Sequence, residues 1–126
     1  MTKARAYAVF LFCAAFCFSS LPAAAARFSG DYLLYVCGSD KNGTELVAGG
    51  HAVCQAYIAG VLDYHNLIRS LGTAPGVDFC VPEEVDLYEL QRKVQSYVFK
   101  NRNLHSKFVA SPGVALGLYA AYPCKK

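Results

Sequence analysis

The sequence has little excess charge of either sign, because twelve Lys and Arg stand against nine Asp and Glu. Two of the bases, Lys3 and Arg5, precede an apolar segment at the N-terminus; without them ten bases face nine acids, a formal net charge of +1. Domains that bind nucleic acid usually cluster Lys and Arg on one face. We therefore expect no nucleic acid among the partners of this chain.

Long apolar runs are also scarce, since only residues 1–26 contain one. A charged start, an apolar centre shorter than about 20 residues and an Ala-rich end are typical of a secretory signal peptide rather than of a membrane anchor. We expect cleavage after Ala26, which also removes Cys13 and Cys17. No second such run follows, so we expect residues 27–126 to form one exported domain without a membrane anchor.

Alternation of apolar and polar residues, internal repeats and glycine-rich phosphate loops are absent from the rest of the chain. Apolar residues recur instead every three or four positions, which is typical of helices. The pattern predicts a small all-α domain of four main helices in an up-and-down arrangement. Ser29 is expected to cap the first helix and Gly38 to end it, and Asp86 with Glu89 predicts a capping box at the start of the third.

The second and fourth predicted helices carry more specific expectations. One face of the second helix is expected to form the core side through Cys54, Tyr57, Ile58, Val61, Tyr64, Leu67, Ile68 and Leu71. Gly60 lies in the middle of this helix and is expected to let another helix approach closely. Because proline suits the first turn of a helix, the fourth helix is expected to begin at Pro112 behind a Ser111 cap, after a separate turn at residues 105–109.

Four cysteines follow the N-terminal segment, and an even number in a small exported domain predicts a disulfide framework. Counting alone leaves three possible pairings. In an up-and-down arrangement, however, the end of each helix lies beside the start of the next. Cys37 should then pair with Cys54, and Cys80, just before the third helix, with Cys124 at the far end of the fourth. The chain-entropy model assigns roughly 3 and 4 kcal/mol to these two loops.

Candidate residues for catalysis or metal binding are few. His51 and Cys54 have the spacing of a metal-ligand pair or of a nucleophile with its base. A zinc site needs four ligands and no second pair is present, so we favour a disulfide for Cys54. Four carboxylates have the chemistry of a general acid/base set: Asp63, Asp78, Glu83 and Glu84. Carboxylates are also common on the surface of a helix and just before a helix start, so we give them no catalytic role. We expect no enzyme, no metal and no cofactor.

Tyrosine is abundant, whereas tryptophan is absent. Eight of the nine tyrosines follow residue 26: Tyr32, Tyr35, Tyr57, Tyr64, Tyr88, Tyr97, Tyr119 and Tyr122. Tyrosines on amphipathic helices form the edge of a core or anchor a protein interface. So many in a small domain lead us to expect a protein interface, with self-association as the simplest case.

Several stretches together resemble one known family. They are CQAYIAGVLD at residues 54–63, FCVPEEVDLYELQRKVQSYV at residues 79–98, His105, and AAYPC at residues 120–124. These are similar to the Rap/Tai family of immunity proteins, small periplasmic helical proteins that neutralise peptidoglycan amidase effectors of type VI secretion. The sequence departs from the family in Ala56, where Gly is usual, and in SPGVALG at residues 111–117, where the last helix is usually continuous.

The resemblance implies a binding protein of the periplasm, commonly a homodimer, that occludes the active-site cleft of an amidase with loops and a helix face. Residues 39–50 and 72–79 are polar and rich in turn residues, so these segments are expected to reach the partner. Asp78, Glu83 and Glu84 are the expected partner-binding charges, at a rim where charge steers encounter.

Two other functions stay open. Small disulfide-bonded helical dimers of the periplasm include HdeA-like acid-stress chaperones, and the three histidines here could act as a trigger, since histidine ordinarily titrates near pH 6.5. The other is an orphan envelope protein with an unknown ligand. Partner choice discriminates among them: an immunity protein binds one amidase tightly, whereas a chaperone binds many denatured clients weakly below neutral pH.

Overall fold

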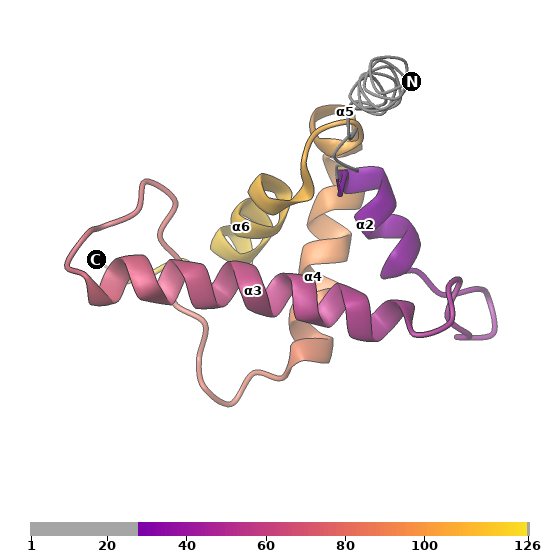
Figure 1. Cartoon of the computed structure of the whole chain (residues 1–126), viewed down its shortest axis with the longest axis horizontal. Helices are drawn as coiled ribbons and strands as arrows, with labels where there is room; N and C mark the ends of the chain where they lie inside the picture. Colours follow the sequence, from indigo (N-terminus) through magenta and orange to yellow (C-terminus); the bar gives the residue numbers. More distant parts are fainter. Residues whose placement is uncertain (1–27, 126) are drawn as a thin grey trace, which may run out of the picture.

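The computed structural model describes residues 28–125, which form helices joined by loops and no strand beyond isolated β-bridges. In chain order the helices are α2 (Gly30–Val36), α3 (Gly50–Ser70), α4 (Leu87–Lys100), α5 (Arg102–His105) and α6 (Ala110–Ala121). α3 is the longest and crosses in front of the others, with α4 and α6 behind it (Figure 1). Within this described range, no helix combines the length and apolarity needed to cross a membrane.

Two disulfides tie the helices together. One joins Cys37 at the end of α2 to Cys54 in the first turns of α3, and the other joins Cys80 to Cys124. The predicted all-α class, the four main helices and both pairings are therefore confirmed, with the four-residue α5 as an addition. The predicted signal peptide, residues 1–26, lies outside the described residues.

Two helix starts follow from short polar side chains, as the sequence predicts. The Ser29 hydroxyl accepts a hydrogen bond from the Tyr32 backbone N–H at 3.2 Å, and the Asp86 carboxylate accepts one from the Glu89 N–H at 2.7 Å. Each bond satisfies a backbone donor that has no partner inside its helix. The starts of α2 and α4 are thus fixed locally.

α6 begins two residues earlier than predicted. Its cap is Val109, whose side chain makes no capping bond, and the Ala110 N–H donates to the Phe28 carbonyl oxygen at 2.8 Å instead. Pro112 then occupies the third position of the helix, where an N–H would have no helical partner to lose. The predicted Ser111 cap is wrong, because a bridge from the chain before α2 satisfies this helix end.

α4 and α6 form the most extensive helix pair and run antiparallel. Gly113 faces Val98 and Gly117 faces Val94, and a Cβ at Gly117 would lie 3.3 Å from the Val94 Cα atom. Within this chain no helix of the described residues approaches Gly60 closely, contrary to the prediction, since a Cβ there would meet nothing within 4 Å. The close approach uses the glycines of α6 because α3 turns its Gly60 side to solvent.

The core lies between α3, α4, α6 and the inner side of α2. Its buried apolar residues are Leu33, Val36, Cys37, Cys54, Ile58, Phe79, Leu90, Val94, Val98, Ala110, Val114 and Leu118. α3 contributes Cys54, Ile58 and the buried His65 to it, whereas Tyr64 and Leu71 are 66% and 69% exposed. The predicted core face of α3 is therefore correct only in part, because two adjacent stripes of this helix are apolar and only one faces the other helices.

Candidate partner-binding surfaces

A long connection, residues 71–86, joins α3 to α4 and extends beyond the helices on both sides of α3 (Figure 1). Its middle is fixed by an anchor, residues 78–80. Phe79 is 2% exposed and its ring stacks on the His65 ring with centroids 3.7 Å apart. Burying an aromatic side chain of this size stabilises a fold by a few kcal/mol, so the anchor holds both halves of the connection in place.

His65 holds the anchor through polar contacts as well. Its Nε2 atom lies 3.1 Å from a carboxylate oxygen of Asp78 and 3.3 Å from the Phe79 backbone nitrogen. A neutral imidazole carries one proton, so Nε2 either donates to Asp78 or accepts from Phe79. Nδ1 is buried with no hydrogen-bond partner among the described residues. A carboxylate oxygen of Asp78 also lies 3.5 Å from the Arg69 Nε atom. Two side chains of α3, His65 and Arg69, therefore contact Asp78.

The chain beyond α6 closes the anchor from the other side. The Cys80 backbone N–H donates to the Tyr122 carbonyl oxygen at 2.8 Å, Phe79 pairs with Pro123 in a β-bridge, and Cys80 is bonded to Cys124. The Tyr122 hydroxyl donates to the Glu89 carboxylate at 3.0 Å. Burial, together with this hydrogen bond, raises the pKa of Tyr122 above its usual value.

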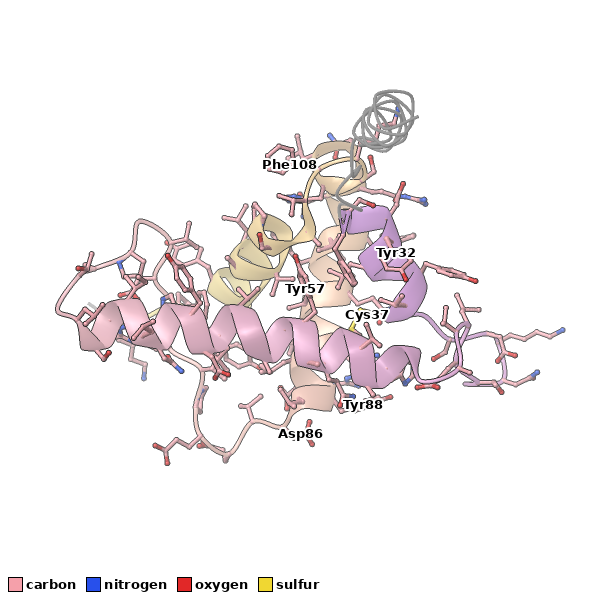
Figure 2. All side chains as sticks on the ribbon, in the orientation of Figure 1. Tyr32, Cys37, Tyr57, Asp86, Tyr88 and Phe108 are labelled. Atoms are coloured by element: carbon pink, nitrogen blue, oxygen red, sulfur yellow. A yellow bond between two sulfur atoms is a disulfide. The ribbon has the colours of Figure 1, made fainter. Side chains whose placement is uncertain are left out.

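The anchor divides the connection into two lobes of different character. The first lobe, residues 71–77, is uncharged and begins with the exposed Leu71. The second lobe, residues 81–86, contains Glu83 and Glu84, which are exposed and make no side-chain hydrogen bond or ion pair among the described residues. Figure 2 shows Asp86 and Tyr88 together at the start of α4, where the second lobe ends. Tyr88 is 56% exposed.

The three predicted partner-binding charges therefore have different environments. Glu83 and Glu84 face solvent in the second lobe, whereas Asp78 lies half-buried in the anchor against His65 and Arg69. The sequence analysis lists Tyr88 among eight tyrosines but does not name it as a partner-binding residue. What distinguishes Tyr88 is the exposed fraction of its side chain beside an acidic loop, and this fraction depends on the tertiary arrangement.

The loop before α3, residues 39–49, uses its carboxylates internally. Asp40 accepts hydrogen bonds from the backbone N–H groups of Asn42 and Thr44 at 2.8 and 3.0 Å. Glu45 accepts from the N–H groups of Gly49 and His51 at 2.8 and 3.0 Å, which satisfies donors at the start of α3. Asp40 and Glu45 are thus engaged with the backbone of this loop and of the first turn of α3.

His51 and Cys54, considered as a metal-ligand pair, have separate roles. The His51 ring hydrogen-bonds to the Ser39 hydroxyl at 3.1 Å, and the Cys54 sulfur is bonded to Cys37. In residues 28–125, no three His, Cys, Asp or Glu side chains gather as metal ligands would. His105, the last residue of α5, is buried against α6 near Gly113, and its ring is tilted relative to the Tyr97 ring beside it.

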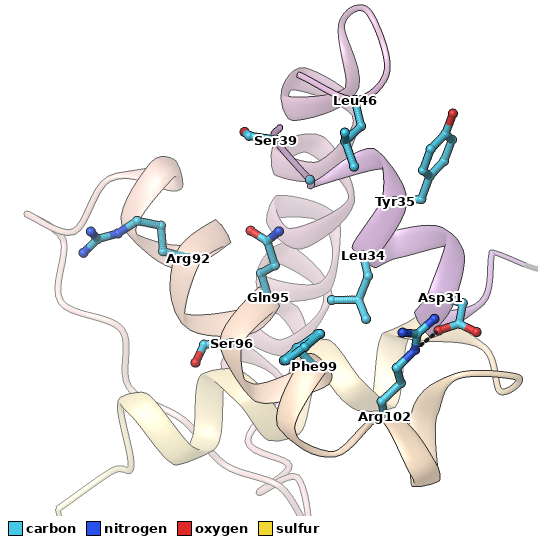
Figure 3. Close-up of a pocket in the computed structure, with 11 residues that line it drawn as sticks. Asp31, Leu34, Tyr35, Ser39, Leu46, Arg92, Gln95, Ser96, Phe99 and Arg102 are labelled. Atoms are coloured by element: carbon cyan, nitrogen blue, oxygen red, sulfur yellow. Dashed lines mark hydrogen bonds and ion pairs between the residues drawn. The ribbon is translucent and has the colours of Figure 1, made fainter. Parts of the chain in front are cut away.

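A groove lies between α2, α4 and the 39–49 loop (Figure 3). Its apolar lining comes from Leu34, Tyr35, Leu46 and Phe99. Charged side chains lie at its ends, but Arg102 and Asp31 are paired with each other at 2.7 Å. The groove is thus mainly apolar, with Arg92 as the one lining cation outside an ion pair among the described residues.

The solvent-facing side of α3 is also apolar. This outer face consists of Val53, Ala56, Gly60, Tyr64, Leu67 and Leu71, all exposed and spaced three or four residues apart. Such a stripe on the outside of a helix is typical of a surface covered by another helix. Tyr57 lies on the inner side, stacked on Phe28 with ring centroids 4.3 Å apart. The tyrosines of α3 therefore divide between the core edge and the surface, as shown for Tyr57 in Figure 2.

A comparison with known proteins shows to which family the chain belongs. The family model described as Rap1a immunity proteins matches residues 29–124, a range that includes the five helices and the two disulfides found in residues 28–125. No curated protein and no solved structure matches the chain. Immunity proteins act by binding a partner effector. The chain belongs to the Rap1a immunity protein family.

Proposed function

We propose that this protein is exported to the periplasm and inhibits a peptidoglycan amidase effector of type VI secretion by covering its active-site cleft. Family membership supports an immunity-type function, and the resemblance to Rap/Tai proteins supports an amidase as the target. The observation that carries the proposal is the α3–α4 connection, residues 71–86, which projects from the helices yet is fixed at its middle.

Fixing a binding loop in advance lowers the entropic cost of binding, because fewer torsions are restricted when the complex forms. The anchor does this through the buried Phe79 ring, the disulfide from Cys80, and the contacts of Asp78 with α3. In this proposal Asp78 contributes to binding by holding the loop, and its carboxylate positions the two lobes.

The second lobe supplies the charge for recognition. Stem peptides of peptidoglycan carry free carboxylates, so a cleft that binds them presents complementary donors or cations. Glu83 and Glu84 are two adjacent exposed carboxylates without partners among the described residues, and they match such a cleft. Tyr88, on the first turn of α4, provides an aromatic side chain of the kind that dominates interface energetics.

Inhibition of a purified amidase tests the proposal. Peptidoglycan hydrolysis by each of a panel of type VI amidase effectors is measured while the oxidised chain, residues 27–126, is titrated in. We expect one amidase to lose activity at about one chain per active site. If every amidase stays active while an effector of another class is bound, the target class is wrong.

Charge and aromatic variants then test the surface. Replacing Glu83 and Glu84 by Gln should lower the association rate several-fold and weaken its salt dependence, since exposed charges act mainly on encounter. Tyr88→Ala should weaken binding by about 2 kcal/mol or more. Asp63→Asn is the matched control, because Asp63 is an exposed carboxylate on α3 that also has no partner among the described residues. Equal effects of all three changes would remove this lobe from the interface.

We further propose that the protein is a homodimer that buries the outer face of α3. The support is a continuous apolar stripe with Gly60 at its middle, where a second helix would meet no Cβ. Sedimentation equilibrium should show a dimer that Leu67→Lys converts to a monomer. Leu104→Lys, at a similarly exposed leucine on α5, should leave the dimer intact. A monomeric wild-type protein would contradict the assignment.

The acid-stress chaperone alternative makes a different prediction in the same assays. A chaperone of this type would suppress the aggregation of many denatured proteins below neutral pH and would inhibit no amidase. Broad client binding combined with full amidase activity would therefore favour the chaperone over the immunity function.

A further inference from the structure

The two disulfides lie in opposite environments. Cys37 and Cys54 are 1% and 0% exposed, within the core beneath α3 (Figure 2). Cys80 is exposed and Cys124 is half-buried, at the surface where the chain leaves α6. A reductant can reach the second bond without unfolding the core, whereas the first is shielded. Access is one of the factors that set the rate of thiol–disulfide exchange.

A cation lies directly against the accessible bond. The Arg69 Nη1 atom is 3.0 Å from the Cys80 sulfur and 3.8 Å from the Cys124 sulfur, and both distances are within the range of N–H hydrogen bonds to sulfur. Asp78 contacts the same guanidinium at Nε, which leaves Nη1 for the sulfurs. A nearby cation stabilises a thiolate, so a thiolate that leaves from Cys80 is favoured over one that leaves from Cys124.

We propose that the bond between Cys80 and Cys124 is a site of thiol–disulfide exchange, attacked at Cys124 by a small thiol or by the dithiol of an oxidoreductase. Cys37 and Cys54 stay oxidised throughout, because the core covers them.

The step balances as an ordinary exchange. The attacking thiolate forms a bond to the Cys124 sulfur, the bond between Cys124 and Cys80 breaks, and the electron pair leaves on the Cys80 sulfur beside Arg69. A second thiolate, from the same dithiol or from another molecule of the small thiol, then attacks the reductant's sulfur atom in the mixed disulfide. This attack releases the Cys124 thiolate. The reductant is oxidised to its disulfide by two electrons, and the two protein thiolates take up protons according to pH.

Exchange at this site would alter the anchor. Without the disulfide, residues 78–80 keep the Phe79 burial and the contacts with His65, but the tie to the chain beyond α6 depends on one backbone bond and a β-bridge. We expect both lobes of the connection to gain mobility and the effector surface to bind less tightly. This consequence rests on the proposed function, whereas the exchange chemistry does not.

Labelling under native conditions tests the chemistry. The oxidised protein is incubated with increasing reduced glutathione or dithiothreitol, quenched with N-ethylmaleimide and mapped by peptide mass. We expect label on Cys80 and Cys124 while the other disulfide remains intact, and a trapped glutathione adduct mainly on Cys124. Reduction of both disulfides together, at the rate of global unfolding, would overturn the proposal, as would an adduct mainly on Cys80.

Variants at one arginine separate the guanidinium effect from accessibility. Arg69→Gln should move the glutathione adduct from a preference for Cys124 toward an even division between the two cysteines. This ratio is read from one sample, so it does not depend on a change in overall exposure. Arg102→Gln is the matched control, since Arg102 is an exposed arginine whose ion pair is with Asp31. An unchanged ratio in Arg69→Gln would remove Arg69 from the site.

A last measurement links the site to the proposed function. Protein reduced and alkylated only at Cys80 and Cys124 is compared with oxidised protein in the amidase assay, and weaker inhibition is expected. Because the labelling needs no effector, exchange can be established even if no amidase is inhibited. The two proposals therefore fail separately.

Discussion

The two ends of α3 are fixed in different ways. At its N-terminal end the disulfide is buried, the buried Gln91 side chain donates to the Cys37 carbonyl oxygen at 3.0 Å, and the carboxylates of the 39–49 loop bind their own backbone. At its C-terminal end the disulfide is at the surface and a longer connection leaves two carboxylates without partners among the described residues. The first end completes the core. The second holds an exposed surface in a defined position.

Removing the Phe79 ring of the anchor should destabilise the structure around the C-terminal end of α3 more than any other change. Phe79→Ala deletes a buried ring stacked on His65 and should lower the free energy of unfolding by about 3–5 kcal/mol. Phe99→Ala, at a ring that is 65% exposed, is the control and should change it by less than about 0.5 kcal/mol. Urea denaturation measures both. Equal losses would show that the anchor adds nothing beyond ordinary surface packing.

At the N-terminal end, the corresponding change is Gln91→Leu. Gln91 accepts a hydrogen bond from the Gln55 amide and donates one to the Cys37 carbonyl, so its loss leaves a buried carbonyl without its donor. We expect a loss of about 1–3 kcal/mol with effector affinity unchanged. Gln95→Leu, on the same helix at the groove, should be close to neutral. A large drop in effector affinity for Gln91→Leu would contradict the division of roles between the two ends.

The smallest expected effect concerns Tyr122, beside the surface disulfide. Tyr122→Phe removes the hydroxyl that donates to Glu89 and should cost about 1 kcal/mol near neutral pH. Because burial and this bond raise the pKa of Tyr122, its contribution is fully present below the ordinary tyrosine pKa and is lost as pH rises through the raised value. The stability difference between wild type and variant should therefore shrink above about pH 10. A difference that stays constant at alkaline pH would argue against the raised pKa.

The sequence predicts those features that depend on local chemistry or on simple topology. Asp86 and Ser29 cap their helices because a short polar side chain can reach the first backbone donors in almost any tertiary context. The two disulfide pairings follow from the order of the helices, because the end of one helix was expected near the start of its neighbour, and both bonds form as predicted. Neither inference needs to know how the helices cross.

Features that depend on packing could not be predicted. α3 has two adjacent apolar stripes, and periodicity does not say whether Tyr64 or His65 faces the core. The start of α6 depends on the Phe28 carbonyl, which lies far away in the sequence. The same limit applies to the candidate site. Asp78 was predicted from its charge alone, and its contact with His65 is visible only in the folded chain.

Amide hydrogen exchange with and without a bound amidase effector tests the central claim most directly. The account predicts new protection across residues 71–88, in the two lobes and the first turn of α4, with residues 39–49 unchanged. Protection confined to residues 39–49 or to the groove between α2 and α4 would contradict it.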